Sequence, residues 1–251
     1  MRVTDGAERV VELLDALGAA PDGLGVSDAA RELDVHRSTA SRLLGTLMAS
    51  DMVERDSITL RYRLGVRVVG LAATAVARLP VVSQARPELE QLSAATSETA
   101  NLAILERFHV VYVDQVTPAQ TVVMASWVGR RSPVHASSSG KAMLAFGDDR
   151  ARQALLRRRL EPLTDRTITD PAVLRAALDE VRRRGYASSM GELEDGLITI
   201  AAPVMVDGKA VAAVSTSGPA YRVPARDLPG LGRRVMEAAA GVGHRMAGRS
   251  S

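Results

Sequence analysis

The first 65 residues alternate between stretches of helical and strand-like periodicity. Apolar residues recur every three or four positions over residues 6–19, which predicts an amphipathic helix. The glycines and proline of "GAAPDGLG" end this helix, and Ser27 is the expected N-cap of a short second helix, "DAAREL". A tight turn at "LDV" leads into a third helix over residues 35–47, "VHRSTASRLLGTL". Polar and apolar residues then alternate in "MVERDSITLRYRLG" around a turn at "DS", so a β-hairpin follows.

The predicted third helix has two contrasting faces. At 100° per residue, Ala40, Leu43, Leu44 and Leu47 share an apolar face, and short polar residues lie opposite. In a helix, serine and threonine cost about half a kcal/mol each relative to alanine, and an interior glycine such as Gly45 costs about 1 kcal/mol. One interpretation is a solvated face of a core helix, but such a face more often carries Glu, Lys and Ala. Hydroxyls, arginine and a bare glycine instead allow close approach to a groove of DNA.

The order helix, short helix, turn, helix and hairpin is typical of a winged helix-turn-helix, whose third helix enters the major groove. We therefore expect residues 1–65 to bind a double-stranded DNA operator. Arg61 and Arg63 are two positions apart on a predicted strand, so both point to one side and are expected to contact phosphates from the wing. The candidates on the third helix and at its start are His36, Arg37, Ser38, Thr39, Ser41 and Arg42.

Residues 66–79 predict a helix that ends before Pro80 and is rich in small residues. Small residues suit close packing between helices. The segment is either an ordinary core helix or a connector that also makes a dimer contact, and its pattern leaves both interpretations open.

Beyond residue 80, hairpin-forming strands have helices before and after them. Pro87 is expected to begin the main part of a helix in "VSQARPELEQLSAATSE". Strands are predicted in "TANLAILERFHVVYVDQV", joined at "ERFH", in "TVVMASW", and in "LITIAAPVMVDGKAVAAVSTSG", with a hairpin at "DG". Further helices are predicted at residues 138–146, 149–160, 171–184 and 228–246. This mixture indicates an α+β domain with a mainly antiparallel sheet over residues 80–251.

Composition narrows the class of protein. Hydrophobic residues make up 46% of the 251, which fits one large or two ordinary globular domains. The absence of cysteine excludes disulfides, thiol catalysis and cysteine-based zinc sites. The chain has no run of about 18 apolar residues, so we expect no membrane span. The N-terminal segment has the pattern of neither a signal peptide nor a transit peptide. We therefore expect a cytoplasmic protein that does not bind a membrane.

Charge adds little to this picture. The net charge of the chain is +3, but residues 1–65 carry eight arginines against eleven acids. The later half of that segment holds most of the arginines, and such a lopsided field suits a nucleic-acid face without establishing one.

Several motifs, in order along nearly the whole chain, resemble the isocitrate lyase regulator (IclR) family of bacterial transcription factors. They are "LDVHRSTASRLLGTLMASDMVER", "YRLGVRVVGLA", "PVHASSSGKAMLA", "RRRGYA" and "ITIAAPVMVDGKAVAAVSTSGP". The resemblance implies a winged helix over residues 1–65, a linker helix over residues 66–79 and a GAF-like effector domain over residues 80–251. It also implies homodimers, often paired into tetramers, and a regulator that responds to a small organic acid.

The resemblance further implies an effector pocket on one face of the sheet, closed by the "HASSSGK" loop and helix. By match to the family, its residues are Thr121, Met124, Ser138, Ser139, Ser189, Thr199, Ser215 and Ser217. Physical reasoning agrees in part, because Ser215 and Ser217 are two apart on a strand and share a face. The free N–H groups at a helix start near Ser138 favour a carboxylate, and Trp127 would form an apolar wall.

Two alternatives remain from the sequence. In the first, the second domain is only an oligomerisation module. In the second, "SSGK" supplies a Ser-x-x-Lys pair of an acyl-serine enzyme, with Ser138 as nucleophile and Lys141 as base. The companion motifs Ser-Asp-Asn and Lys-Thr-Gly are absent, and the four histidines lack metal-ligand spacing. We therefore expect no enzyme activity, no metal and no cofactor.

Overall fold

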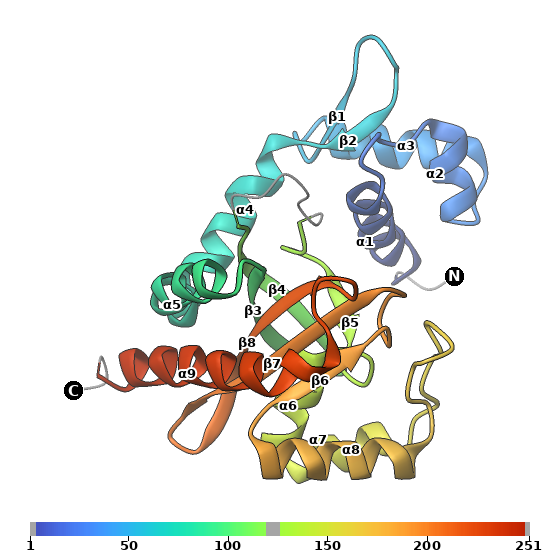
Figure 1. Cartoon of the computed structure of the whole chain (residues 1–251). Coiled ribbons are helices and arrows are strands. Elements are labelled where there is room, and N and C mark those ends of the chain that lie inside the picture. The colour runs from blue at the N-terminus through green and yellow to red at the C-terminus, as the bar shows by residue number, and fades with distance from the viewer. Residues whose placement is uncertain (1–3, 119–125, 249–251) are drawn as a thin grey trace. The chain divides into compact units, whose positions relative to one another are not determined.

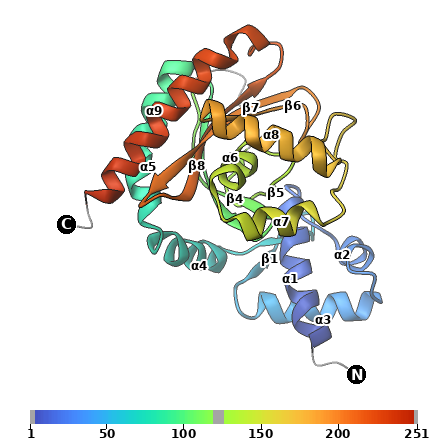
Figure 2. The same ribbon diagram turned by 90° about the horizontal axis from the view of Figure 1, so that it is seen from below.

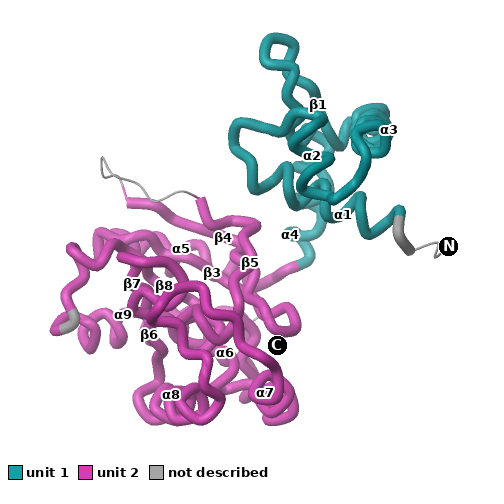
Figure 3. Tube along the Cα trace, turned by 90° about the vertical axis from the view of Figure 1, so that its right-hand side faces the viewer, with its two compact units in different colours: residues 1–78 teal, residues 79–251 magenta. Residues whose placement is uncertain are grey.

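The computed structural model describes residues 4–118 and 126–248. The chain divides into two compact units, Met1–Arg78 and Leu79–Ser251 (Figure 3). The helix predicted at residues 66–79 is observed and belongs to the first unit, where it contributes no buried residue. It is therefore not a core helix within this chain.

The first unit is a winged helix-turn-helix. It contains, in order, α1 (Thr4–Ala19), α2 (Val26–Glu32), α3 (Arg37–Met48), β1 (Val53–Arg55), β2 (Tyr62–Leu64) and α4 (Val66–Ala77). The strands β1 and β2 pair antiparallel, and a bridge from Leu24 to Tyr62 ties the segment before α2 to the wing. The apolar sides of α1, α2 and α3 bury one core with the hairpin, which includes Leu13, Leu17, Leu44, Leu47, Val53 and Tyr62.

The start of α2 differs from the prediction. The N-cap is Gly25 rather than Ser27, and the Gly25 N–H donates to the Asp28 carboxylate at 3.3 Å. A carboxylate in the first turn stabilises the free N–H groups there, which allows the helix to begin before Ser27.

The second unit is an α+β domain around one antiparallel sheet. The strands are β3 (Thr99–Glu106), β4 (His109–Val116), β5 (Arg131–Pro133), β6 (Ala187–Met190), β7 (Leu197–Val206) and β8 (Lys209–Pro219). Their order is β5-β4-β3-β8-β7-β6, and every neighbouring pair is antiparallel. The turn between β7 and β8 has Asp207 and Gly208 at positive φ, as the "DG" signal predicted.

Helices cover both faces of this sheet (Figures 1 and 2). One face is covered by α5 (Pro80–Thr96) and α9 (Leu228–Ala247), and α9 follows a short 3-10 turn at Ala225–Asp227. The other is covered by α6 (Ser138–Phe146), α7 (Asp149–Leu156) and α8 (Pro171–Arg184). The sheet therefore lies between two separate hydrophobic cores.

Two further predictions in this unit need correction, and a third falls mostly outside the described residues. Pro87 lies inside α5, which begins at Pro80, because proline at the first helical position already has a suitable φ. The helix predicted over 149–160 ends at Leu156. Most of "TVVMASW" lies outside the described residues, and Trp127 at its end is not in a strand.

No single helix among the described residues is long and apolar enough to span a membrane. Only α4 and α5 taken together, as a bent pair, reach the required length and hydropathy.

Candidate DNA-binding helix and effector site

The exposed face of α3 carries the side chains expected to contact DNA. Ala40, Leu44 and Leu47 are buried, whereas Arg37, Ser38, Ser41 and Arg42 are exposed and Thr39 is partly exposed. The guanidinium groups of Arg37 and Arg42 make no hydrogen bond or ion pair with any described residue, although the Arg42 carbonyl accepts from Thr46 Oγ1 at 2.9 Å. Their guanidinium groups therefore remain available to phosphates and guanine edges.

His36 has a structural role that the sequence did not reveal. It is the N-cap of α3, and its Nδ1 accepts a hydrogen bond from the Ser38 backbone N–H at 3.3 Å. The same nitrogen lies 2.8 Å from Ser38 Oγ. His36 thus fixes the start of the helix, even though its side chain is exposed.

Arg61 and Arg63 differ in environment. Arg61 lies one residue before β2, and its Nε donates to the Gly23 carbonyl at 2.9 Å while its guanidinium lies 3.4 Å from the Asp28 carboxylate. Arg61 therefore fastens the wing to the start of α2 and does not share a strand with Arg63. Arg63 lies within β2 and is exposed, which keeps it as the phosphate candidate on the wing.

Gly45 has open space around it. A Cβ added there would meet no atom within 4 Å, so packing inside the chain does not require glycine. We expect Gly45→Ala to raise the free energy of unfolding by about 0.5–1 kcal/mol, because alanine is the better helix former, and to lower DNA affinity, because the methyl group occupies the contact face.

Thermal unfolding and DNA titration at fixed salt test this pair of opposite effects. Gly6→Ala is the matched control, because an added Cβ is equally unobstructed at the start of α1. Undiminished DNA affinity in Gly45→Ala would place this face away from DNA.

The effector candidates of the second unit lie on the face of the sheet that α6 covers. Thr199 pairs with Ser217 on one side and with Ser189 on the other, and Ser217 also pairs with Thr99. Cross-strand partners share a face, so these four residues form a polar row across β3, β8, β7 and β6. Ser215 and its partner Asn101 form the neighbouring row on the same face.

The helix α6 lies over these rows and has no solvent-exposed side along residues 138–145. Its N-cap, Ser137, accepts from the Gly140 N–H at 3.1 Å and donates to the Pro133 carbonyl at 3.1 Å. Gly140 is required here, because a Cβ would lie 2.3 Å from Val134 Cα. The first N–H groups of α6 have no partner within the helix, so this end can hold an anion.

Several buried polar atoms on α6, on the sheet and on the loop after β6 have no hydrogen-bond partner among the described residues. They are Ser138 Oγ, Asn101 Oδ1 and Glu192 Oε2. Ser189 Oγ, in contrast, donates to the Ala136 carbonyl at 2.8 Å, and Asn101 Nδ2 donates to Ser217 Oγ at 3.2 Å. Unpaired buried polar atoms cost free energy, so such a group of atoms is typical of a site that a ligand completes.

Two aromatic residues close one side of this region. Trp127 is buried and packs edge-on against Tyr112, with ring centroids 5.2 Å apart. Arg130 lies over the Trp127 ring at 4.1 Å and forms an ion pair with Glu194 at 2.5 Å. Burial raises the pKa of Tyr112 to about 12, so its hydroxyl stays protonated. Thr121 and Met124 lie outside the described residues.

Lys141 and Glu192 were not predicted as part of the site. The Lys141 ammonium, 3% exposed, lies 2.6 Å from Glu192 Oε1. Burial lowers the pKa of Lys141, and the Glu192 carboxylate opposes this shift. No hydrogen bond joins Ser138 to Lys141 in the described chain, so the pair lacks the geometry of a serine nucleophile and its base.

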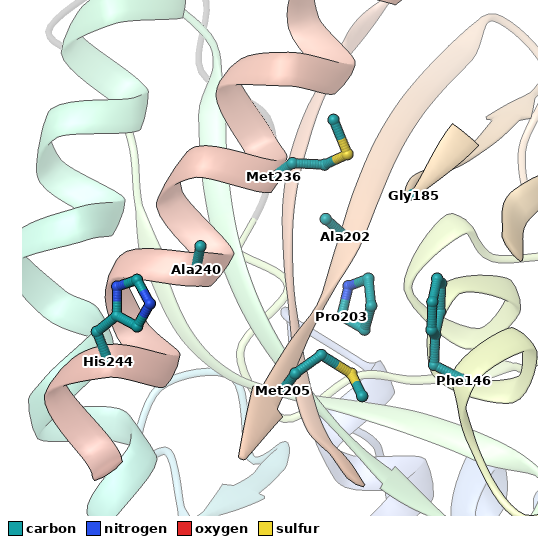
Figure 4. Close-up of a pocket in the computed structure, with 8 residues that line it drawn as sticks. All are labelled: Phe146, Gly185, Ala202, Pro203, Met205, Met236, Ala240 and His244. Atoms are coloured by element: carbon teal, nitrogen blue, oxygen red, sulfur yellow. The ribbon is translucent and has the colours of Figure 1, made fainter. Parts of the chain in front are cut away.

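A separate cavity of about 290 Å³ lies at the edge of β7, beyond its last pairing with β6. Met205 lines it from β7, Met236, Ala240 and His244 from α9, and Phe146 from the end of α6 (Figure 4). None of its lining residues belongs to the polar rows, so it is distinct from the effector candidates.

Comparison with known proteins agrees with both halves of this description. The family model of the IclR helix-turn-helix domain matches residues 6–57, and that of the bacterial transcriptional regulator IclR C-terminal domain matches residues 73–244. The HTH-type transcriptional regulator BhcR of Paracoccus denitrificans is 37% identical over 244 residues, which are 96% of this chain and 87% of that protein.

Two further relatives extend the comparison. The HTH-type transcriptional repressor AllR of Escherichia coli is 32% identical over 234 residues, covering 92% of this chain and 86% of that protein. The crystal structure of an IclR homolog from Microbacterium hydrocarbonoxydans, complexed with 4-hydroxybenzoate, aligns with a TM-score of 0.80 at 29% identity over 98% of this chain and 100% of that one. With its winged helix, its α+β domain around a six-stranded antiparallel sheet and these relatives, the chain belongs to the IclR family of DNA-binding bacterial transcriptional regulators.

Proposed function

We propose that this regulator is a homodimer in which α3 and Arg63 of each copy contact the operator. We further propose that a small carboxylate binds between α6 and the sheet and changes the affinity of the protein for DNA. The observation that carries the proposal is the set of unpaired buried atoms at the start of α6 and on the facing sheet. A domain used only for assembly has no need of such atoms.

The carboxylate follows from the chemistry of this site. Hydroxyls at Ser138 and Ser139 and free N–H groups at the start of α6 are hydrogen-bond donors that suit an anion. The solved relative from Microbacterium hydrocarbonoxydans is complexed with 4-hydroxybenzoate, a carboxylate, which supports the same class for this chain.

The proposal of a dimer rests on the exposed apolar side chains of α4. Val66, Val69 and Leu71 are 76%, 66% and 54% exposed, and a second copy of the chain would remove them from water. Two winged helices in a dimer read half-sites about 34 Å apart or a multiple of this distance, so a ligand that alters their spacing alters operator affinity. Pairing of two dimers into a tetramer and location in the cytoplasm complete the proposal.

The test removes two hydroxyls from the site. In the double variant Ser215→Ala and Ser217→Ala, we expect operator binding to persist and the response to carboxylates to be lost, because the polar partners of the ligand are gone. Isothermal titration with and without operator measures the coupling. It is expected at about 1–3 kcal/mol in the wild type, and ligand and DNA must affect each other by the same factor.

Thr216→Val is the matched control. Thr216 lies between the two serines on β8 but faces the opposite side of the sheet, so the ligand response should persist. A full ligand response in the serine double variant would mean that the ligand binds at a different place in the protein. Equal ligand affinity with and without operator would show that ligand binding and DNA binding are not coupled. It would favour the alternative in which the second domain serves only for oligomerisation.

A further inference from the structure

The buried pair Lys141–Glu192 has no explanation in stability alone. Both side chains are withdrawn from water, on α6 and on the loop that follows β6. Taking two charges out of water costs free energy that their attraction only partly offsets, so apolar residues of similar size generally stabilise a core at least as well.

The protein holds the Glu192 loop in place on its other side. The Glu192 carbonyl accepts from Thr167 Oγ1 at 2.7 Å, and the Gly191 carbonyl accepts from Thr164 Oγ1 at 2.6 Å. Gly191 also has a positive φ of 74°, which favours glycine. The carboxylate is therefore positioned by the fold as well as by Lys141.

Among the described residues, only one oxygen of this carboxylate has a hydrogen-bond partner. Oε1 contacts Lys141, and Oε2 is buried with no described group to bond it. Asn101 repeats the pattern within the described part of the chain, because Nδ2 donates to Ser217 Oγ and Oδ1 has no partner there. An ionised carboxylate oxygen and an amide oxygen only accept hydrogen bonds, so a group that completes them must be a donor.

A carboxylate ligand alone does not meet this requirement, because at neutral pH it has no donor. The serine hydroxyls and the start of α6 suit the anionic group of the ligand, whereas Glu192 Oε2 and Asn101 Oδ1 suit a different group. Lys141 neutralises Glu192, so an anionic ligand can approach it.

Resting on the function proposed above, we propose that the effector is a hydroxylated carboxylate and that Glu192 and Asn101 accept hydrogen bonds from its hydroxyl groups. Glu192 and Asn101 are then together the residues that distinguish a hydroxy acid from the same acid without the hydroxyl, and the preference requires both. A site built to bind a hydroxyl rejects the analogue that lacks it, so the preference should be about tenfold or more.

Matched pairs of acids test the ligand class. The probes are benzoate with 4-hydroxybenzoate, propionate with lactate, and succinate with malate, titrated calorimetrically into the full chain. In at least one pair the hydroxylated acid should bind about tenfold or more tightly, and its partner correspondingly weakly. Equal affinity within every pair that binds, or no binding by any hydroxylated member, overturns the proposal.

Variants then test the residues. In Lys141→Met with Glu192→Met, the preference for the hydroxylated member should fall to about one, because the acceptor is gone without leaving an unpaired charge. Asn101→Leu is an independent variant with the same expectation, in case the double variant does not fold. Asp195→Asn, an exposed acid in the same loop, is the control and should keep the preference.

A preference that survives in Asn101→Leu or in a folded double variant overturns the assignment. The proposed function fails separately. If an acid without hydroxyls binds and changes operator affinity, regulation by a carboxylate stands and only the hydroxyl requirement is lost.

Discussion

Glu192→Ala is expected to lower the free energy of unfolding of the second unit by about 3–5 kcal/mol. The variant leaves the ammonium of Lys141, a residue of α6, buried without the carboxylate that lies 2.6 Å from it. Urea unfolding followed by circular dichroism measures the loss. The deficit should shrink as the pH rises toward the usual lysine pKa of about 10.4, because burial lowers the pKa of folded Lys141 and the neutral amine carries no desolvation penalty.

The double variant Lys141→Met with Glu192→Met separates charge from packing. It removes both charges at similar volume, so its stability should be close to that of the wild type or higher. If Glu192→Ala proves no less stable than the wild type, water reaches the lysine and the pair is not buried in solution.

Arg42→Ala is expected to weaken binding to the preferred DNA sequence by about 1–3 kcal/mol, with a much smaller effect on unrelated sequences. Arg42 is exposed on α3, its guanidinium group has no partner among the described residues, and it lies three positions before the open Gly45. The measurement is a titration at fixed salt, with a duplex selected from a random pool and a scrambled duplex.

Arg31→Ala is the control for loss of one positive charge. Arg31 is exposed at the end of α2, so its removal should affect selected and scrambled DNA alike. Equal losses of both DNAs in Arg42→Ala would assign Arg42 to the phosphate backbone instead of a base.

The elements with strong local signals could be predicted from the sequence. The helices α1 to α3, the β3–β4 and β7–β8 hairpins and α8 with Gly185 at its end all depend on periodicity, caps and turns within a few residues. Two short strands of the second unit could not be found in this way. The strands β5, "RSP", and β6, "ASSM", are brief and polar, and they exist because longer neighbours pair with them.

The site residues likewise divide into those that a local pattern indicates and those that come together only in the folded chain. Ser215 and Ser217 were correctly expected to share a face, because strand alternation is a local rule. Lys141 and Glu192 are 51 positions apart, and the contact of Arg61 with Asp28 spans 33. Such pairs depend on the register of distant elements, and no pattern within one segment indicates them.

The alternation along β8 has a consequence for how such regulators diverge. Ser215 and Ser217 face α6, whereas Val214 and Thr216 face the layer of α5 and α9. On the function proposed above, residues that contact the ligand and residues that pack in the core therefore alternate along this strand. Evolution can therefore exchange a hydroxyl at an odd-numbered position to favour a new signal molecule while the even-numbered residues preserve the architecture. A single-residue insertion would swap the two roles, so drift toward new ligands should proceed by substitution rather than by changes in length.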